Sequence, residues 1–248
     1  MHVAGRDLHV EVRWIAPEFG RGAPLMVFLH EGLGSLSMWR DFPQQVADAC
    51  GCEAIVYSRH GYGRSDPLTE KRAPGFMHHE ARVCLPQLLD QLAVERPILF
   101  GHSDGGSIAL IYAGGVPDHR ARGVVTMAAH VFNEAVCVKS IAQARDAYAA
   151  TDLRQRLARY HGDNVDNAFR GWNDAWLDPA FRQWDISEQL AFIRVPMLIV
   201  QGANDQYGTV KQIEVAKDEC YCPVEVALID AKHTPQREAP DETLRVIA

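Results

Sequence analysis

The segment GHSDGG (residues 101–106) holds one hydroxyl among glycines, a pattern suited to a serine nucleophile. A short apolar run, Pro97–Phe100, precedes it, and an Ala- and Ile-rich segment follows it. We therefore predict a strand, a sharp turn and a helix, with Ser103 at the apex of the turn. Glycines flank such a serine because a Cβ nearby would collide with the crossing helix. The alternative is a glycine-rich turn that only packs closely.

A serine needs a base to take its proton, and the base needs an acid to orient it. Asp205 follows an apolar run in VQGANDQYG (residues 200–208), and His233 follows the next run in LIDAKHTPQ (residues 228–236). We predict that Ser103 attacks, that His233 carries the proton and that Asp205 orients His233. Asp230 is the alternative acid, although its closeness in sequence to His233 favours a structural role.

Composition limits the class of protein. The 248 residues are 47% hydrophobic and 23% charged, which suits one α/β domain that carries an insertion. A net charge of −7 argues against nucleic acid or an anionic membrane as a partner. No apolar run approaches the length of a membrane span, and the N-terminus lacks the apolar core of a signal peptide, so we expect a cytoplasmic protein.

The six cysteines do not have the spacing of a redox or zinc site. Cys50 and Cys52 form one C-x-C pair, and Cys220 and Cys222 form another. We expect reduced thiols and neither a metal nor an organic cofactor. A metal site built from the four sulfurs is the alternative.

Apolar patterns predict the elements of a sheet. Residues 8–16 alternate between apolar and polar, which suits an antiparallel strand. Continuous apolar runs predict buried parallel strands at 24–30, 53–58, 97–100, 123–129, 196–202 and 224–230. Helices are expected at 35–50, 77–93 and 209–219. Pro43 lies inside the first of these helices, and Pro86 should kink the second. A Gly/Pro turn is expected at 18–24. A last helical pattern starts at 241 and stops at 248, so we expect the chain to end early.

Strands that alternate with helices predict an α/β fold with a doubly wound, mostly parallel sheet. Between 129 and 196 only helical patterns occur, at 133–161, 165–177 and 187–192. We assign residues 1–129 and 195–248 to the core and residues 130–194 to an inserted helical cap rich in aromatic residues. We expect Leu33, His130, Trp172 and Trp176 to bind substrate; the alternative is that the rings only pack the cap against itself.

Five segments carry a family resemblance: HEGLGS (30–35), SRHGYGRS (58–65), GHSDGG, VQGANDQYG and DAKHTP (230–235). Together they resemble the α/β-hydrolase-fold enzymes across essentially the whole chain. The compact cap and the S-D-G-G turn are similar to small-ester hydrolases of the valacyclovirase type. The resemblance implies an oxyanion hole made by the N–H of Asp104 and that of Gly32, with Leu33 as the alternative to Gly32.

The chain departs from the family pattern at three positions. Glu31 replaces the usual glycine, and Ser58 and His60 stand where Asp and Arg are common. Two carboxylates, Glu31 and Asp104, would therefore flank the oxyanion hole and oppose the developing negative charge. Either each is paired locally, Glu31 with an arginine (59 or 64) and Asp104 with the start of its own helix, or they select substrates with a positive group near the scissile carbonyl.

We therefore predict a serine hydrolase of small carboxylic esters, aminoacyl esters among them, that works through an acyl-enzyme on a small-molecule substrate. The sequence leaves the oligomeric state open. Alternatives are a C–C bond hydrolase acting on vinylogous diketones, a ligand receptor that keeps the triad, and a cofactor-independent oxygenase or perhydrolase.

Overall fold

The computed structural model of the chain describes residues 2–3, 5–19 and 24–248. Seven strands form one sheet in the order β3-β5-β4-β6-β7-β8-β9. β3 runs antiparallel to β5, and the other neighbouring strands are parallel. The strands are β3 (Val12–Ile15), β4 (Met26–Leu29), β5 (Ala54–Tyr57), β6 (Ile98–His102), β7 (Gly123–Met127), β8 (Met197–Gly202) and β9 (Val224–Ile229). The predicted mostly parallel sheet is confirmed.

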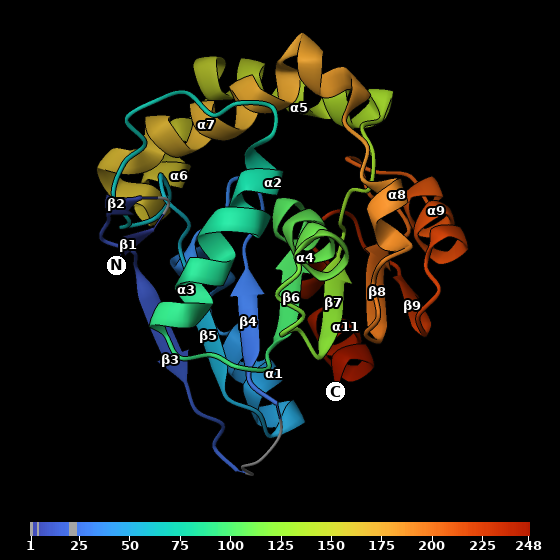
Figure 1. Cartoon of the computed structure of the whole chain (residues 1–248). Helices are drawn as coiled ribbons and strands as arrows, with labels where there is room; N and C mark the ends of the chain where they lie inside the picture. The colour runs from blue at the N-terminus through green and yellow to red at the C-terminus, as the bar shows by residue number, and fades with distance from the viewer. Residues whose placement is uncertain (1, 4, 20–23) are drawn as a thin grey trace.

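Helices cover both faces of this sheet (Figure 1). One face packs against α3 (Leu85–Gln91), α4 (Asp104–Gly115) and α9 (Lys211–Glu219), and the other packs against α1 (Phe42–Cys50) and α11 (Pro240–Ile247). Two separate apolar clusters lie on the two faces because the central strands are buried on both sides. The short helix α10 (Pro235–Glu238) precedes α11.

The chain between β7 and β8 is helical, as predicted. It forms α5 (Ala135–Ala150), α6 (Leu153–His161), η3 (Gly162–Asn164), α7 (Val165–Leu177), η4 (Pro179–Gln183) and α8 (Ser187–Leu190). Figure 1 shows α5, α6 and α7 lying across the top of the sheet. We call these three helices the helical layer. α8 instead packs beside α4 and α9.

The predicted helix 133–161 is interrupted at Thr151, which ends α5 in an extended conformation. Its hydroxyl donates to Ala147 O, and its oxygen accepts from the N–H of Leu153. The side chain therefore ends one helix and starts the next, which apolar periodicity cannot show.

Two other helices differ in their boundaries. The segment 35–50 divides into η1 (Leu36–Trp39) and α1, and Pro43 lies in the first turn of α1, where a missing N–H costs little. The segment 77–93 becomes α2 (Phe76–His79), the π-helical η2 (Glu80–Cys84) and α3, with Pro86 in the first turn of α3. Pro43 therefore begins a helix, whereas Pro86 lies within a continuous helical run, directly after the π-helical turn that interrupts its regular α-helical bonding.

Two short strands, β1 (His2–Val3) and β2 (Arg6–Asp7), form a separate antiparallel pair that the sequence patterns did not predict. Most of the expected turn at 18–24 lies outside the described residues. None of the helices in the described ranges combines the length and apolar character needed to cross a bilayer.

Candidate active site

Ser103 lies at the turn between β6 and α4, and its backbone is in a rare conformation, with φ 52° and ψ −118°. The glycines around it are required by close packing. A Cβ on Gly105 would lie 2.0 Å from Leu29 O, and one on Gly101 would lie 2.2 Å from Gly105 O. The crossing of α4 over the strands is thus possible only without side chains at these positions, as the sequence pattern indicated.

The structure brings the three residues of the predicted triad together. His233 Nε2 lies 2.9 Å from Ser103 Oγ, and His233 Nδ1 lies 2.9 Å from each carboxylate oxygen of Asp205. Gln201 Nε2 and the Tyr207 N–H also donate to Asp205, each at 2.8 Å. The alignment allows His233 to take the Ser103 proton while Asp205 holds the other ring nitrogen protonated.

The pKa shifts of His233 and Asp205 agree with their positions in the triad. Burial alone would lower the pKa of His233, but the hydrogen bond and the negative charge of Asp205 outweigh it, so the His233 pKa is raised. Burial would raise the pKa of Asp205, yet its hydrogen bond with His233 and the other donors lower it. Asp205 is therefore an anion at neutral pH, and His233 is a stronger base than an ordinary histidine.

The alternative acid, Asp230, lies elsewhere. It is exposed and accepts a hydrogen bond from Asn204 Nδ2 at 2.9 Å, away from His233. His102 is buried behind the site, where its Nε2 lies 2.8 Å from the main-chain oxygen of His233. It thus supports the loop that carries His233.

The cavity at Ser103 has a volume of only about 50 Å³. The predicted residues Gly32, Leu33, Asp104, His130, Trp172 and Trp176 all line it, together with Glu31, Cys137, Ile141, Tyr207 and the Ser–His pair. Sequence reasoning missed Cys137 and Ile141, which lie one turn apart on α5, and Tyr207, which follows Asp205 by two residues. The apolar spacing on α5 was the available signal, but it does not distinguish a pocket wall from a core.

Trp172 closes this cavity over the loop after β4. A Cβ on Gly32 would lie 2.1 Å from Trp172 Cδ1, so the indole ring rests directly on the glycine backbone. The Gly32 N–H has no hydrogen-bond acceptor among the described residues. Asp104 is the first residue of α4, where helix N–H groups also lack acceptors within the helix. Both groups are thus available as donors.

Asp104 does not bond to the start of its own helix, so the local pairing expected for it is wrong. Its Oδ1 instead accepts from Trp176 Nε1 at 3.0 Å, although 72 residues separate the two. Its Oδ2 is buried and lacks a partner among the described residues. Burial raises the Asp104 pKa to about 6, and the positive charge of Arg59 and the Trp176 hydrogen bond only partly oppose this rise.

Glu31 is half-buried at the same cavity. The pairing with an arginine that was expected for its carboxylate does not occur. The guanidinium of Arg59 bonds to the main-chain oxygens of His30 and Glu31 instead, and the Arg64 residue is exposed. Among the described residues no side chain bonds to the Glu31 carboxylate. Two carboxylates with unused oxygens therefore border the Ser103 cavity.

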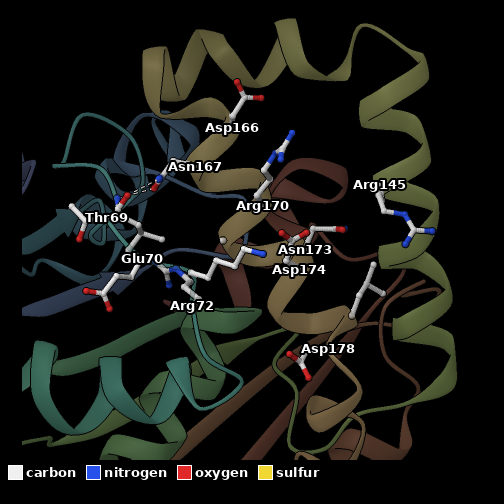
Figure 2. Close-up of a pocket in the computed structure, with 14 residues that line it drawn as sticks. Thr69, Glu70, Arg72, Arg145, Asp166, Asn167, Arg170, Asn173, Asp174 and Asp178 are labelled. Atoms are coloured by element: carbon white, nitrogen blue, oxygen red, sulfur yellow. Dashed lines mark hydrogen bonds between the residues drawn. The ribbon is translucent and has the colours of Figure 1, made fainter.

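A larger groove of about 750 Å³ lies beside α7 (Figure 2). The loop 68–72, the outer face of α7 and Arg145 of α5 border it. Its lining mixes four basic with four acidic side chains, several of them paired with residues outside the groove, as Asp166 is with Arg154. The groove does not include Ser103, so size alone does not indicate the reactive centre.

The described residues contain no group of three or more His, Cys, Asp or Glu side chains arranged to hold a metal ion. The two C-x-C pairs precede β5 and β9, which lie near opposite edges of the sheet. The alternative of a four-sulfur site is therefore wrong. All six cysteines are free thiols.

Comparisons with known proteins agree with this geometry. The family model of the alpha/beta hydrolase fold matches residues 24–176. The 3-oxoadipate enol-lactonase 1 of Acinetobacter baylyi is 25% identical over 264 residues, which cover 98% of this chain and 92% of the relative. The 2-hydroxy-6-oxononadienedioate/2-hydroxy-6-oxononatrienedioate hydrolase 2 of Pseudomonas putida is 25% identical over 215 residues, with coverage of 77% and 74%.

Solved structures share the fold. The enol-lactonase of Burkholderia xenovorans LB400 superposes with a TM-score of 0.74 at 20% identity and covers 100% of this chain and 97% of its own. The esterase of Exiguobacterium antarcticum gives 0.73 at 19% identity, with coverage of 96% and 93%. These relatives give no support to the narrower resemblance to valacyclovirases. Because the family model spans more than half of the chain, the protein belongs to the alpha/beta hydrolase fold family and is a hydrolase.

Proposed function

We propose that this protein is a serine hydrolase that cleaves small carboxylic esters through an acyl-enzyme. The observation that supports it most is the line of hydrogen bonds from Ser103 through His233 to Asp205, with 2.9 Å at each step. The strained backbone of Ser103, at the end of a buried strand, holds the hydroxyl toward the cavity lined by Gly32 and Asp104.

The reaction has two halves. Ser103 Oγ gives its proton to His233 Nε2 and bonds to the ester carbonyl carbon, while the N–H groups of Gly32 and Asp104 stabilise the oxyanion. His233 then protonates the leaving alkoxide, which departs as an alcohol and leaves an acyl group on Ser103. A water molecule gives a proton to His233 and attacks the acyl-enzyme. The carboxylic acid leaves, and the proton returns to Ser103.

Asp104 supports a narrower substrate class, esters with an ammonium group on the acyl part. Its side chain starts next to the nucleophile, and its Oδ2 lacks a partner in the described part of the chain. A substrate ammonium would supply a charge-assisted hydrogen bond to it, while a carboxylate on the acyl part would be repelled. Glu31 adds a second negative charge at the same cavity.

The relative from Pseudomonas putida supports one alternative, a C–C bond hydrolase, which could use the same triad. Its name and that of the enol-lactonase describe substrates with carboxylate groups. Such anions fit poorly beside Asp104 and Glu31. We therefore favour neutral or cationic esters for this chain.

Labelling with a fluorophosphonate probe, followed by assays on p-nitrophenyl and aminoacyl esters, tests the proposal. Ser103→Ala should abolish labelling and lower kcat by about 10⁶, with the fold intact by circular dichroism. Unchanged ester turnover by purified Ser103→Ala would reject it. Labelling without turnover of any ester would favour the receptor alternative, and cleavage of vinylogous diketones alone would favour the C–C hydrolase.

A further inference from the structure

The loop after β4 is held from behind by buried donors that bond to its main-chain oxygens. Arg59 Nη1 donates to His30 O at 2.7 Å, and Arg59 Nη2 donates to Glu31 O at 3.1 Å. His30 Nδ1 lies 2.7 Å from the same Glu31 oxygen, and the Gly34 N–H donates to it at 3.1 Å. Three groups therefore converge on one carbonyl.

Burying the Arg59 side chain beneath this loop removes a charged group from water, which costs free energy. Its side chain is buried, with 1% of the residue exposed, and no carboxylate of the described residues lies within 4.0 Å of it. Its Nε also lacks a hydrogen-bond partner in the described part of the chain. The carboxylates of Asp104 and Glu80 stabilise its charge from beyond that distance, but the direct bonds of the guanidinium go to two main-chain oxygens of the β4 loop. These bonds indicate a role in holding that loop.

The planarity of the peptide bond after Glu31 links Arg59 to the Gly32 N–H. The bond between Glu31 and Gly32 is trans, so the Glu31 C=O and the Gly32 N–H point in opposite directions. Arg59 holds the carbonyl on the buried side, and the N–H is thereby turned away from Arg59, where no acceptor of the described residues meets it. We propose that Arg59 is a positioning residue that fixes the Gly32 N–H as an oxyanion donor, an inference that rests on the proposed function.

The positive charge of Arg59 also makes the Gly32 N–H a better hydrogen-bond donor. A guanidinium that bonds to a carbonyl oxygen polarises the peptide, and the N–H on its other side becomes a stronger donor. The neighbouring Ser58 is held in place separately, since its Oγ donates to Glu11 and accepts from the N–H of Leu36.

Arg59→Met, which keeps bulk but removes charge and donors, tests the proposal. We expect kcat on a p-nitrophenyl ester to fall by about 30-fold or more, and KM to change less than about threefold, because the donor acts mainly on the transition state. Arg72→Met is the matched control. Arg72 is also a buried arginine over the Tyr62 ring, but it bonds to His60 O and lies near Glu80.

The control should keep kcat within about threefold of the wild-type value, whatever its loss in melting temperature. Equal losses of kcat in the two variants, or a folded Arg59→Met with nearly normal kcat, would overturn the proposal. The fluorophosphonate labelling rate should fall in parallel with kcat, because phosphonylation uses the same oxyanion donors.

A thionoester substrate gives a readout that general loosening of the fold would not change. Sulfur accepts hydrogen bonds poorly, so a thionoester gains little from the oxyanion donors. Arg59→Met should therefore slow the oxoester strongly and the thionoester weakly, which compresses their ratio by about tenfold or more. An unchanged ratio would show that Arg59 does not act through these donors.

Arg59→Lys covers the case in which the methionine variant does not fold. Lysine keeps the charge, but one ammonium cannot reproduce the planar bond to two successive carbonyls. We expect an intermediate kcat and an intermediate ratio; wild-type values for both would overturn the proposal. If Ser103→Ala retained turnover, the proposed function would fail first, whereas an inactive Ser103→Ala beside a fully active Arg59→Met would reject only this inference.

Discussion

Asp104, which follows Ser103, and Asp205, which bonds to His233, are two buried carboxylates with opposite pKa shifts. Asp205 receives hydrogen bonds from Gln201, Tyr207 and His233, and its pKa is lowered. Asp104 receives one, from Trp176, and burial raises its pKa to about 6. Burial pushes both pKa values upward, so the number of donors and the charge of the partner decide the outcome.

The difference indicates two tasks for the same chemical group. Asp205 is satisfied by the protein before substrate arrives, as an acid that orients His233 must be. Asp104 keeps one oxygen that has no partner among the described residues, and a ligand that supplies a donor would offset the free-energy cost of burying it. The end of the site at Asp205 is thus complete in the folded chain, whereas the end at Asp104 is completed only when a ligand supplies a donor.

Asp205→Asn should have the largest effect. The amide no longer stabilises the imidazolium and favours the wrong tautomer of His233, so kcat should fall by about 10⁴ on charged and neutral esters alike. Stopped assays on aminoacyl esters and on neutral esters measure this fall in kcat. Asp230→Asn is the control and should keep near-normal kcat because the exposed Asp230 carboxylate bonds to Asn204 and not to His233. A small effect of Asp205→Asn would remove the contrast between the two carboxylates.

The complete end of the site was predictable from sequence, whereas at the other end the residues around the cavity were predicted but the partner of Asp104 was not. Ser103, Asp205 and His233 each follow a parallel strand, and parallel strands bring their carboxyl ends to one edge whatever the details of packing. The Trp176–Asp104 hydrogen bond depends on how α7 is seated over α4, which no local pattern encodes.

The role of Arg59 was missed for a related reason, since the sequence suggested it only as a partner of the Glu31 carboxylate. A single arginine beside a strand end is usually exposed, and only the structure shows that it turns beneath the β4 loop. The boundary between α5 and α6 depends on the side chain of Thr151, and so apolar periodicity merged the two helices.

Asp104→Asn should have the next largest effect. The amide keeps the shape, the backbone donor and an oxygen for Trp176, but it loses the charge. We expect kcat/KM for aminoacyl esters to fall tenfold or more, about 1.4 kcal/mol per factor of ten, while neutral esters of similar size are spared. Paired alanyl and propionyl esters provide the measurement. Equal losses on both would mean that Asp104 only shapes the turn.

The preference for the ammonium group should depend on pH. Because the Asp104 pKa is about 6, the carboxylate is charged above that pH and neutral below it. The ratio of kcat/KM for alanyl over propionyl esters should therefore rise as pH increases from 5 to 7, with a midpoint near 6. Titration of His233 affects both substrates and cancels in the ratio. A flat ratio in the wild type, or a sloping one in Asp104→Asn, would contradict the assignment.

Trp176→Phe should give the smallest effect and the sharpest test of what sets the Asp104 pKa. The phenyl ring keeps an aromatic side chain beside His130, Phe181 and Trp184 but removes the side-chain donor that bonds to the carboxylate. A hydrogen bond to a charged group contributes about 1.5 kcal/mol or more, so its loss should move the midpoint of the preference upward by about one pH unit. Trp172→Phe is the matched control, because Trp172 lines the same cavity and makes no hydrogen bond to Asp104. Its midpoint should stay near that of the wild type. If both variants shifted the midpoint equally, the pKa of Asp104 would depend on the size of the cavity, and the contrast with Asp205 would rest on burial instead of on donors.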